Sequence, residues 1–360
     1  MKIYFYPHAY LRDRQLETIR QWPSNQVFNK DIADNRQGAQ VSRSDSLAKT
    51  QSWFDTIKLP LLNIKLRPKG APTGSIVYVW GGLVLSGKFI VDLDNPWSLV
   101  GYNVNAMPIY RSFIKKILLS QRCLEIRCMS KACKASLKTL FGDIVSQKAR
   151  LHYPTAGIEP ANHPSPSNPK LVRFLFIGTQ FEIKGGEALL QAFEKASKKN
   201  TNIQLDLISH LPENFFKRIS KSPNIILHDP NYTREQIFTE FLSNCDVLIH
   251  TSYMESFGMT VLEAISQGLA VIANDIYALR ELVIDGKNGF LLDPPITKWD
   301  GVLPNDYFMK KNEFLMAIRG LSNEQYVDRL ADCIVTLSED TAALDKMKKS
   351  SLEVFKAIYE

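Results

Sequence analysis

The sequence predicts an α/β protein with two doubly wound, Rossmann-like domains that face a cleft. Three observations support this fold class. A chain of 360 residues is too long for one comfortable hydrophobic core. Strand-like and helix-like runs alternate along it, which is typical of βαβ units and a parallel sheet. Between the halves lies a proline-rich stretch, residues 154–170, where regular structure is disfavoured because proline removes a backbone donor and fixes φ.

The second half carries the clearer alternation. Six short apolar runs predict strands, at residues 171–177, 203–208, 224–227, 247–250, 270–273 and 289–292. Four runs between them predict helices, at residues 185–197, 233–243 (with Thr233 as N-terminal cap), 260–267 and 278–283. We therefore expect the second domain to span residues 171–339 and a final helix to span residues 340–360.

The first half shows a looser version of the same pattern. The predicted strands are residues 2–6, 75–80, 88–91, 123–128 and 148–153. The predicted helices are residues 11–21, 109–120 and 131–140. Residues 25–70 indicate no particular element. The first domain is expected to span residues 1–153, with residues 154–170 as the interdomain linker.

Charge is distributed unevenly along the chain, whose net charge is +7. Residues 1–150 carry 23 Lys and Arg against 10 Asp and Glu, a net charge of +13, whereas the remainder carries 21 against 27, a net charge of −6. A basic first half indicates an anionic partner (a membrane face, a lipid diphosphate, an acidic glycan or nucleic acid) or simply a solvated basic surface.

Cellular location is indicated by two absences and by the number of cysteines. No apolar run reaches the roughly 18–20 residues of a membrane-spanning helix, and the first residues lack the apolar stretch of a secretory signal. Five cysteines, an odd number in a large core-forming chain, favour reduced thiols and the cytosol.

The most informative stretch is residues 246–264, DVLIHTSYMESFGMTVLEA, in which an apolar strand runs into a loop and then a helix. Backbone N–H groups at such a helix start suit a diphosphate or sugar hydroxyls, and Gly258 would let the backbone approach the ligand. Glu255 and Glu263 supply two carboxylates that can accept hydrogen bonds from different hydroxyls. A local alternative stays open, because Thr260 and Glu263 have the spacing of a capping box.

The two glutamates, with seven residues between them that include Ser256-Phe257-Gly258-Met259, resemble the E-x7-E signature of retaining GT-B glycosyltransferases, specifically glycosyltransferase family 4. Two further segments are similar to the same family and appear in its order. Phe176-Ile177-Gly178 with Lys184-Gly185-Gly186 resembles its phosphate loop, and residues 280–291 resemble the closing segment of its nucleotide domain. The resemblance covers about 120 residues. It implies the GT-B fold, a donor bound by the second domain, an acceptor bound by the first, and a final helix packed back across the hinge.

The resemblance also implies roles for individual residues. Glu255 would face the transferred sugar and Lys184 would contact the donor diphosphate, and both are expected to be catalytic. Glu263 would hold the ribose hydroxyls, and the strand end at His228 would lie near the base. The residues expected to bind the donor are Gly178, Thr179, Lys184, Gly185, His228, Glu255, Ser256, Phe257, Gly258, Met259, Thr260 and Glu263. Many family members carry arginine where this chain has Thr179, so one positive contact on the diphosphate is missing or comes from elsewhere.

Residues of the first domain give a weaker indication of an acceptor side. The family often has a histidine at a strand end there, and Asp94 or Asn95 is expected to take its place. Trp80, Gly81 and Gly82, at another strand end, are expected to line the acceptor side or to form a plain turn.

Several metal-binding patterns are also present in part. Asp92-Leu93-Asp94 matches the D-x-D motif by which GT-A glycosyltransferases bind magnesium or manganese, but such an enzyme does not need the second nucleotide-binding half. The six histidines lack metal-ligand spacing, and His250 is expected to pack beside its strand. Three evenly spaced cysteines lack a fourth zinc ligand, so buried thiols are expected at Cys123, Cys128 and Cys133.

Residues 111–122 combine an apolar stripe with four cations. Such a helix lies on an anionic membrane surface or faces the core with a basic solvent side.

These expectations combine into one predicted function. The chain is expected to transfer a hexosyl group from a nucleotide-diphosphate sugar to a hydroxyl of a glycan or lipid-linked acceptor, with retention and without a metal or other cofactor. Cell-surface polysaccharide or lipid-linked glycan synthesis is the expected context, in the cytoplasm or on the inner face of the membrane, with no nucleic-acid partner. Two alternatives stay open: a nucleotide-sugar epimerase of GT-B fold, and an inactive nucleotide-sugar-binding module.

Overall fold

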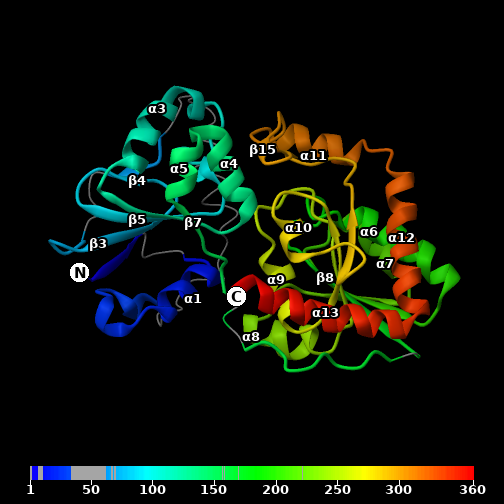
Figure 1. Ribbon diagram of the computed structural model, residues 1–360. Coiled ribbons are helices and arrows are strands. Elements are labelled where there is room, and N and C mark those ends of the chain that lie inside the picture. Colours follow the sequence, from blue (N-terminus) through cyan, green and yellow to red (C-terminus); the bar gives the residue numbers. More distant parts are fainter. Residues whose placement is uncertain are drawn as a thin grey trace. The chain divides into compact units, whose positions relative to one another are not determined.

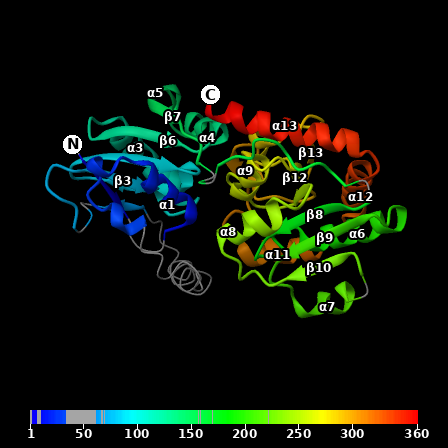
Figure 2. The ribbon, with the colours of Figure 1, turned by 90° about the horizontal axis from the view of Figure 1, so that it is seen from below.

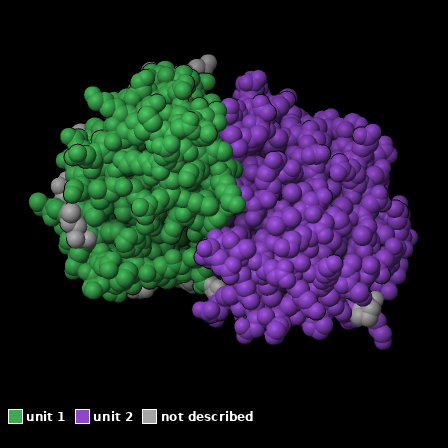
Figure 3. Space-filling view, viewed as in Figure 1, with its two compact units in different colours: residues 1–157 green, residues 158–360 purple. Residues whose placement is uncertain are grey.

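The computed structural model describes residues 2–6, 11–33, 62–65, 68, 70–155, 157, 159–168, 170–220 and 222–360. The chain divides into two compact units, Met1–Gly157 and Ile158–Glu360, hereafter the N-terminal and C-terminal units (Figure 3). Each unit contains a parallel sheet with helices packed on it. The predicted α/β class is confirmed.

The N-terminal unit is built on a five-stranded parallel sheet, ordered β1-β3-β5-β6-β7 (Figure 1). Its strands are β1 (Ile3–Tyr6), β3 (Ile76–Trp80), β5 (Lys88–Leu93), β6 (Cys123–Cys128) and β7 (Ala149–Leu151). Its helices are α1 (Asp13–Gln21), α3 (Ala106–Leu119), α4 (Lys131–Phe141) and α5 (Asp143–Lys148), with 3-10 turns at Ser24–Gln26, Lys30–Ala33 and Pro96–Val100. Two short strands, β2 (Ile64–Lys65) and β4 (Leu83–Val84), pair with each other. Phe5, Ile19 and Tyr78 are fully buried in the core between this sheet and α1.

The C-terminal unit contains a six-stranded parallel sheet in the order β10-β9-β8-β11-β12-β13. Its strands are β8 (Val172–Ile177), β9 (Ile203–Ile208), β10 (Ile225–His228), β11 (Val247–His250), β12 (Ala270–Asn274) and β13 (Gly289–Leu292). Numbered from the first strand of the unit, this order is the doubly wound order 3-2-1-4-5-6. Chain direction across the sheet therefore reverses between β8 and β11, where such sheets bind ligands beyond the carboxyl ends of the strands.

Helices cover both faces of this second sheet (Figure 2). One core is shared by the strands with α6 (Gly186–Lys199), α7 (Glu213–Ile219) and α12 (Glu324–Glu339). Packed together elsewhere on the sheet are α9 (Met259–Ser266), α10 (Leu279–Leu282) and α13 (Thr341–Tyr359). The remaining elements are α8 (Arg234–Gln236), a π-helical turn at Ile237–Leu242, the hairpin β14 (Trp299–Asp300) and β15 (Leu303–Pro304), and α11 (Lys311–Arg319).

The final helix α13 is tied to its own unit by buried polar contacts. Lys348, 1% exposed, donates to Asp246 at 2.6 Å and to Ser167 at 3.2 Å. The Ser351 hydroxyl donates to the carbonyl of Leu269. Residues 159–168, which lie in the predicted linker, thus belong to the C-terminal unit. Residues 156, 158 and 169 of that linker lie outside the described residues, as does most of the unassigned stretch 25–70.

Most predicted strands and helices are found within about three residues of their predicted ends. The predicted cap is present, because the Thr233 hydroxyl accepts the N–H of Gln236. The predicted helix 233–243 is instead α8 followed by the π-helical turn. Four helices, α5, α7, α11 and α12, were not predicted. Of these, α12 has a clear signal, because Tyr326, Val327, Leu330, Ala331 and Ile334 are buried at helical spacing.

None of the described helices combines the length and the apolar character that a membrane crossing requires.

Candidate functional site

Two loops of the C-terminal unit meet at the point where the strand order reverses. One loop follows β8 and leads into α6 at Gly186, and the other follows β11 and leads into α9 at Met259. The Thr251 hydroxyl of the second loop donates to the Lys184 carbonyl of the first at 3.0 Å, and the Tyr253 N–H donates to the Ile183 carbonyl at 2.9 Å. The two loops therefore form one hydrogen-bonded unit that carries two helix N-termini.

Glycine is required at the closest approach of these loops. Gly185 has φ +75°, and a Cβ there would lie 2.3 Å from the Thr251 carbonyl oxygen. Gly258, at the start of α9, has φ +95°, and a Cβ there would lie 2.4 Å from the Leu279 side chain. Because the first N–H groups of a helix have no partner within it, both starts offer donors to an anion.

Lys184 and Glu255, the two residues predicted to be catalytic, are brought together by these loops. The Lys184 ammonium lies 2.7 Å from Glu255 Oε2. His250 Nε2 lies 3.2 Å from the same oxygen, and the Ser256 N–H donates to Oε1 at 3.2 Å. His250 was predicted only to pack beside its strand. That prediction is incomplete, because its ring contacts the carboxylate that the motif singled out.

Electrostatic surroundings keep Glu255 ionised. Burial raises its pKa, but Lys184 and His250 outweigh burial and hold the pKa of this carboxyl well below its usual range. Burial lowers the pKa of His250, an effect that its hydrogen bond to Glu255 only partly offsets. These directions favour a carboxylate at Glu255 and a neutral imidazole at His250.

A buried amide supports the loop between His250 and Glu255. The Asn274 side chain, at the end of β12, donates to the carbonyls of Thr251 and Ser252 at 2.8 and 3.1 Å. Its oxygen in turn accepts from the Tyr326 hydroxyl of α12 at 2.6 Å. The loop is therefore hydrogen-bonded to a second strand and, through it, to a helix that sequence reasoning missed.

An apolar cluster also packs against both loops. It contains Ile183 beside Lys184, Tyr253 two residues before Glu255, and Phe314 and Ile318 of α11. Residues of α11 thus pack against the two loops that carry Lys184 and Glu255, although the sequence indicated no role for them.

Glu263 does not occupy the third helical position that a capping box with Thr260 would require. The N-cap of α9 is Gly258, not Thr260, and Glu263 is in the second turn of the helix. Its Oε1 accepts from Arg234 Nε at 3.0 Å and Nη2 at 2.9 Å. The capping-box alternative is therefore wrong. Arg234, at the start of α8, is a partner that no motif indicated.

His228 lies at the end of β10, as predicted from the strand. Its Nε2 is 2.8 Å from Asp206 Oδ1, and its ring packs edge-on against Phe241. Thr179 is exposed directly after the buried Gly178. That these residues bind a donor stays a prediction, as it does for Ser256, Phe257, Met259 and Thr260.

The residues predicted for the acceptor side lie at two neighbouring strand ends of the N-terminal unit. Trp80 ends β3 and is followed by Gly81 and Gly82, while Asp94 and Asn95 follow β5. Both glycines have positive φ, in keeping with a turn. The Asn95 side chain is buried and caps a 3-10 turn by accepting the Trp97 N–H. Asp94 accepts from the Tyr102 hydroxyl.

Asp92, the first aspartate of the D-x-D pattern, is buried and already bonded. Its Oδ1 accepts from Arg14 Nη1 at 3.1 Å and its Oδ2 from the Tyr78 hydroxyl at 2.7 Å. The described residues contain no group of three or more His, Cys, Asp and Glu side chains arranged to hold a metal. His8 lies outside them. Cys123, Cys128 and Cys133 are buried thiols, as predicted.

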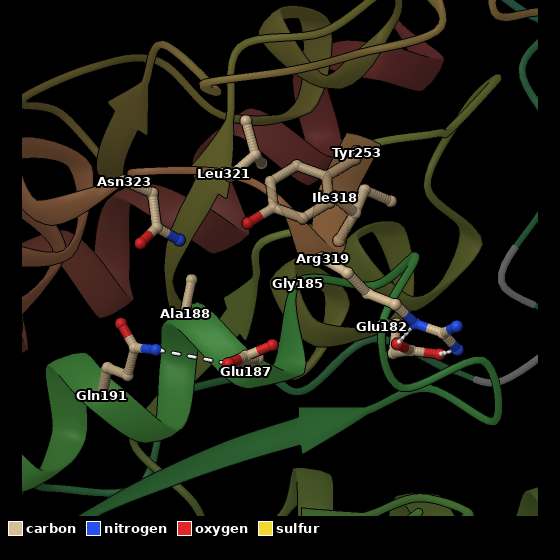
Figure 4. A pocket seen from close by; sticks show the side chains of 10 residues that line it. All are labelled: Glu182, Gly185, Glu187, Ala188, Gln191, Tyr253, Ile318, Arg319, Leu321 and Asn323. Carbon is tan, nitrogen blue, oxygen red and sulfur yellow. Dashed lines mark hydrogen bonds and ion pairs between the residues drawn. The ribbon is translucent and has the colours of Figure 1, made fainter. Parts of the chain in front are cut away.

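A small hollow lies beside the loop pair rather than on it (Figure 4). It measures about 30 Å³, is lined by Gly185, Glu187 and Tyr253 among others, and has room for roughly one water. The Tyr253 hydroxyl and the Asn323 amide point into the same space (Figure 4). Neither Lys184 nor Glu255 lines it, so we do not regard it as the site.

Comparison with known proteins agrees with this geometry. Residues 158–302 match the family "Glycosyl transferases group 1". A 41.2 kDa protein in the cps region of Klebsiella pneumoniae is 31% identical over 124 residues, which are 34% of this chain and 33% of that protein. The D-inositol 3-phosphate glycosyltransferase of Paenarthrobacter aurescens is 25% identical over 138 residues, which are 35% and 32% of the two chains. The matched part thus spans about a third of these relatives.

A solved structure extends the similarity of fold to the whole chain. HepE of Anabaena, crystallised with UDP and glucose, superposes with a TM-score of 0.60 at 13% identity and covers 99% of this chain and 95% of its own. The chain therefore has the GT-B fold. Residues 158–302, within the C-terminal unit, are similar to the group 1 glycosyltransferase family.

Proposed function

We propose that this chain is a retaining glycosyltransferase that moves a hexosyl group from a nucleotide-diphosphate sugar to an acceptor hydroxyl. The proposal rests on one observation, the joining of Lys184 and Glu255 at the point of strand reversal, between the N-termini of α6 and α9. A cation and two helix starts suit a diphosphate, and an ionised carboxylate suits the hydroxyls of a sugar.

In the proposed reaction the bond between the anomeric carbon and the diphosphate breaks, the acceptor oxygen bonds to the same carbon, and the acceptor's hydroxyl proton passes to the departing nucleoside diphosphate. Negative charge grows on the departing diphosphate. Lys184 and the helix-start N–H groups would stabilise it, at about 3–4 kcal/mol for each well-placed donor. These groups can replace a divalent ion, so we propose a reaction without a metal cofactor.

The acceptor is proposed to be a glycan or lipid-linked molecule bound by the N-terminal unit. The basic balance of residues 1–150 supports an anionic acceptor or membrane surface. On α3, Ile109 and Phe113 are 61% and 43% exposed, with Lys116 exposed beside them. Apolar and basic side chains mixed on one outer face suit an anionic lipid surface. We therefore propose that the enzyme acts on the cytoplasmic face of a membrane, in cell-surface polysaccharide or lipid-linked glycan synthesis.

A thermal-shift panel of nucleoside diphosphates and their sugars tests the donor site, because a ligand that binds only the folded state raises the melting temperature. UDP and UDP-glucose belong in the panel because HepE was crystallised with UDP and glucose. The best donor is then incubated with glycan and lipid-linked acceptors, with and without EDTA. We expect transfer in both. No shift from any nucleotide would refute the donor site, and transfer that EDTA stops and manganese restores would refute the metal-free reaction.

The same assay separates the two alternatives. Conversion of the donor to an epimer without acceptor would identify an epimerase. Binding without turnover in any acceptor screen would identify an inactive module.

Membrane binding is tested by sedimentation with vesicles of phosphatidylglycerol and phosphatidylcholine, against phosphatidylcholine alone. We expect binding to the anionic vesicles, weakened in Phe113→Ser. Met316→Ser is the matched control, because Met316 is 69% exposed on α11 of the other unit. Equal binding of wild type and both variants would count against α3.

A further inference from the structure

The contact between His250 and Glu255 is not needed to explain the binding of a diphosphate. His250 is the last residue of β11 and is 4% exposed. Its backbone is held in register opposite Ala273 of β12. The imidazole is therefore anchored on the central part of the sheet, whereas Glu255 and Lys184 lie on loops.

The two donors to Glu255 Oε2 differ in their freedom to move. Lys184 Nζ, at 2.7 Å, is at the end of a flexible four-carbon side chain, about a quarter exposed. His250 Nε2, at 3.2 Å, belongs to a rigid ring with a side chain only 5% exposed. A diphosphate that binds between the helix starts would draw the ammonium toward itself. The contact between Lys184 and Glu255 would then weaken at the step where the carboxylate must contact the sugar.

The chemistry of the pair determines where the ring proton lies. An ionised carboxylate can only accept hydrogen bonds, so His250 Nε2 must carry a proton. Burial keeps the ring neutral, because it lowers the pKa of His250. The remaining groups that act on the ring are Lys184, whose charge lowers this pKa, and Glu255, which raises it. We therefore expect His250 to be a neutral Nε2–H tautomer.

We propose that His250 is a positioning residue, which holds the Glu255 carboxylate in place for the sugar when Lys184 turns to the diphosphate. This inference rests on the proposed function. It assigns a role to a residue outside the E-x7-E motif. It also explains why Glu255 needs two donors on one oxygen.

The test compares His250→Gln with His250→Met. The two side chains have similar length, but only glutamine can place an N–H near the position of Nε2. With the donor chosen by the thermal-shift panel, we expect His250→Met to lower kcat about 10–100-fold. A displacement of the Glu255 carboxylate by about 1 Å is enough for a loss of that size. His250→Gln should recover most of the rate. Binding of the nucleoside diphosphate alone should be unchanged in both, and the exposed His163→Leu serves as the control.

Two readouts separate positioning from mere folding. Loss of the His250 donor raises the pKa of Glu255, so the acid limb of the rate profile should move to higher pH in His250→Met and not in His250→Gln. In the wild type, ¹⁵N NMR of labelled histidine should show a neutral Nε2–H ring that changes in Glu255→Gln. The NMR measurement needs no sugar donor, and it tests the proposal even if His250→Met does not fold.

The proposal would be overturned by equal rates in the glutamine and methionine variants, or by an Nδ1–H or charged ring in the wild type. Failure of the wild type to turn over any donor is a different result, because it refutes the proposed function. The NMR measurement of the His250 tautomer then remains the test of the contact with Glu255.

Discussion

Polar side chains cluster at the carboxyl ends of the strands in both sheets, but the two clusters differ in how exposed their central carboxylate is. In the C-terminal unit, Lys184 from one loop and His250 from a strand contact the Glu255 carboxylate, which lies on a second loop and is about a fifth exposed. In the N-terminal unit, Asp92 is 4% exposed and both its oxygens are bonded to Arg14 and Tyr78. We propose that the first cluster exchanges a partner for a ligand, whereas both Asp92 oxygens are already bonded within the fold. Polar residues at a strand end are therefore not by themselves a site.

Replacement of Glu255 should have the largest effect. Glu255→Ala removes the carboxylate expected to meet the sugar, so we expect transfer to fall by about 10³-fold or more, as for loss of a main catalytic group. Affinity for the nucleoside diphosphate should stay largely intact. Steady-state kinetics and calorimetry measure the two quantities. A variant with nearly the wild-type rate would show that Glu255 does not contact the sugar.

Replacement of Lys184 should affect both binding and rate. Lys184→Ala removes a cation from the diphosphate, which we expect to lower the rate about 10²–10³-fold and to weaken nucleoside diphosphate binding as well. Lys195→Ala is the matched control, because the Lys195 side chain, on the helix that follows, is 41% exposed and pairs with Asp328 on α12. If the Lys184 variant bound nucleotide as tightly as the control, the diphosphate would have to lie elsewhere.

Replacement of Asp92, in the N-terminal unit, should affect stability rather than nucleotide binding. Asp92→Ala leaves the buried Arg14 and Tyr78 without this partner, which we expect to lower the free energy of unfolding by about 3 kcal/mol. Nucleoside diphosphate affinity should be unchanged. Denaturant titration and calorimetry on the same samples give both values. Loss of affinity without loss of stability would mean that this cluster, too, is a functional site.

The sequence predicted most of the strands and helices around the candidate site and the two charged residues, Lys184 and Glu255, that the structure brings together there. Lys184 and Glu255 were predictable because each follows an apolar strand and precedes a helix start with glycine. The supporting residues were not predictable. His250, Asn274 and Arg234 have no distinctive spacing, since each acts on an atom brought near it only by strand order and loop path.

The missed helix α12 shows a second limit of sequence reasoning. Its apolar spacing is regular, but its contribution to the site passes through one hydrogen bond, from Tyr326 to Asn274. A pattern predicts that a helix exists, whereas the partner of one hydroxyl depends on how the helix packs. The same holds for Asp92, whose D-x-D spacing gives no sign of Arg14, 78 residues earlier in the chain.

Three glycine variants compare the two units directly, and the smallest effect is expected at Gly286. Gly185, Gly81 and Gly286 all have positive φ, so alanine at each should lower stability by about 1 kcal/mol from backbone strain alone. At Gly286 no atom lies within 4 Å of the added Cβ, and we expect nothing further. At Gly81 the added Cβ meets the Ser98 side chain at 2.8 Å, so stability should fall more while nucleotide affinity stays the same. At Gly185 it meets a backbone oxygen at 2.3 Å, in the loop that leads to Glu255. There both stability and nucleotide affinity should fall, as measured by denaturant titration and calorimetry. If Gly81→Ala weakened nucleotide binding as much as Gly185→Ala, the functional difference between the two strand ends would not hold.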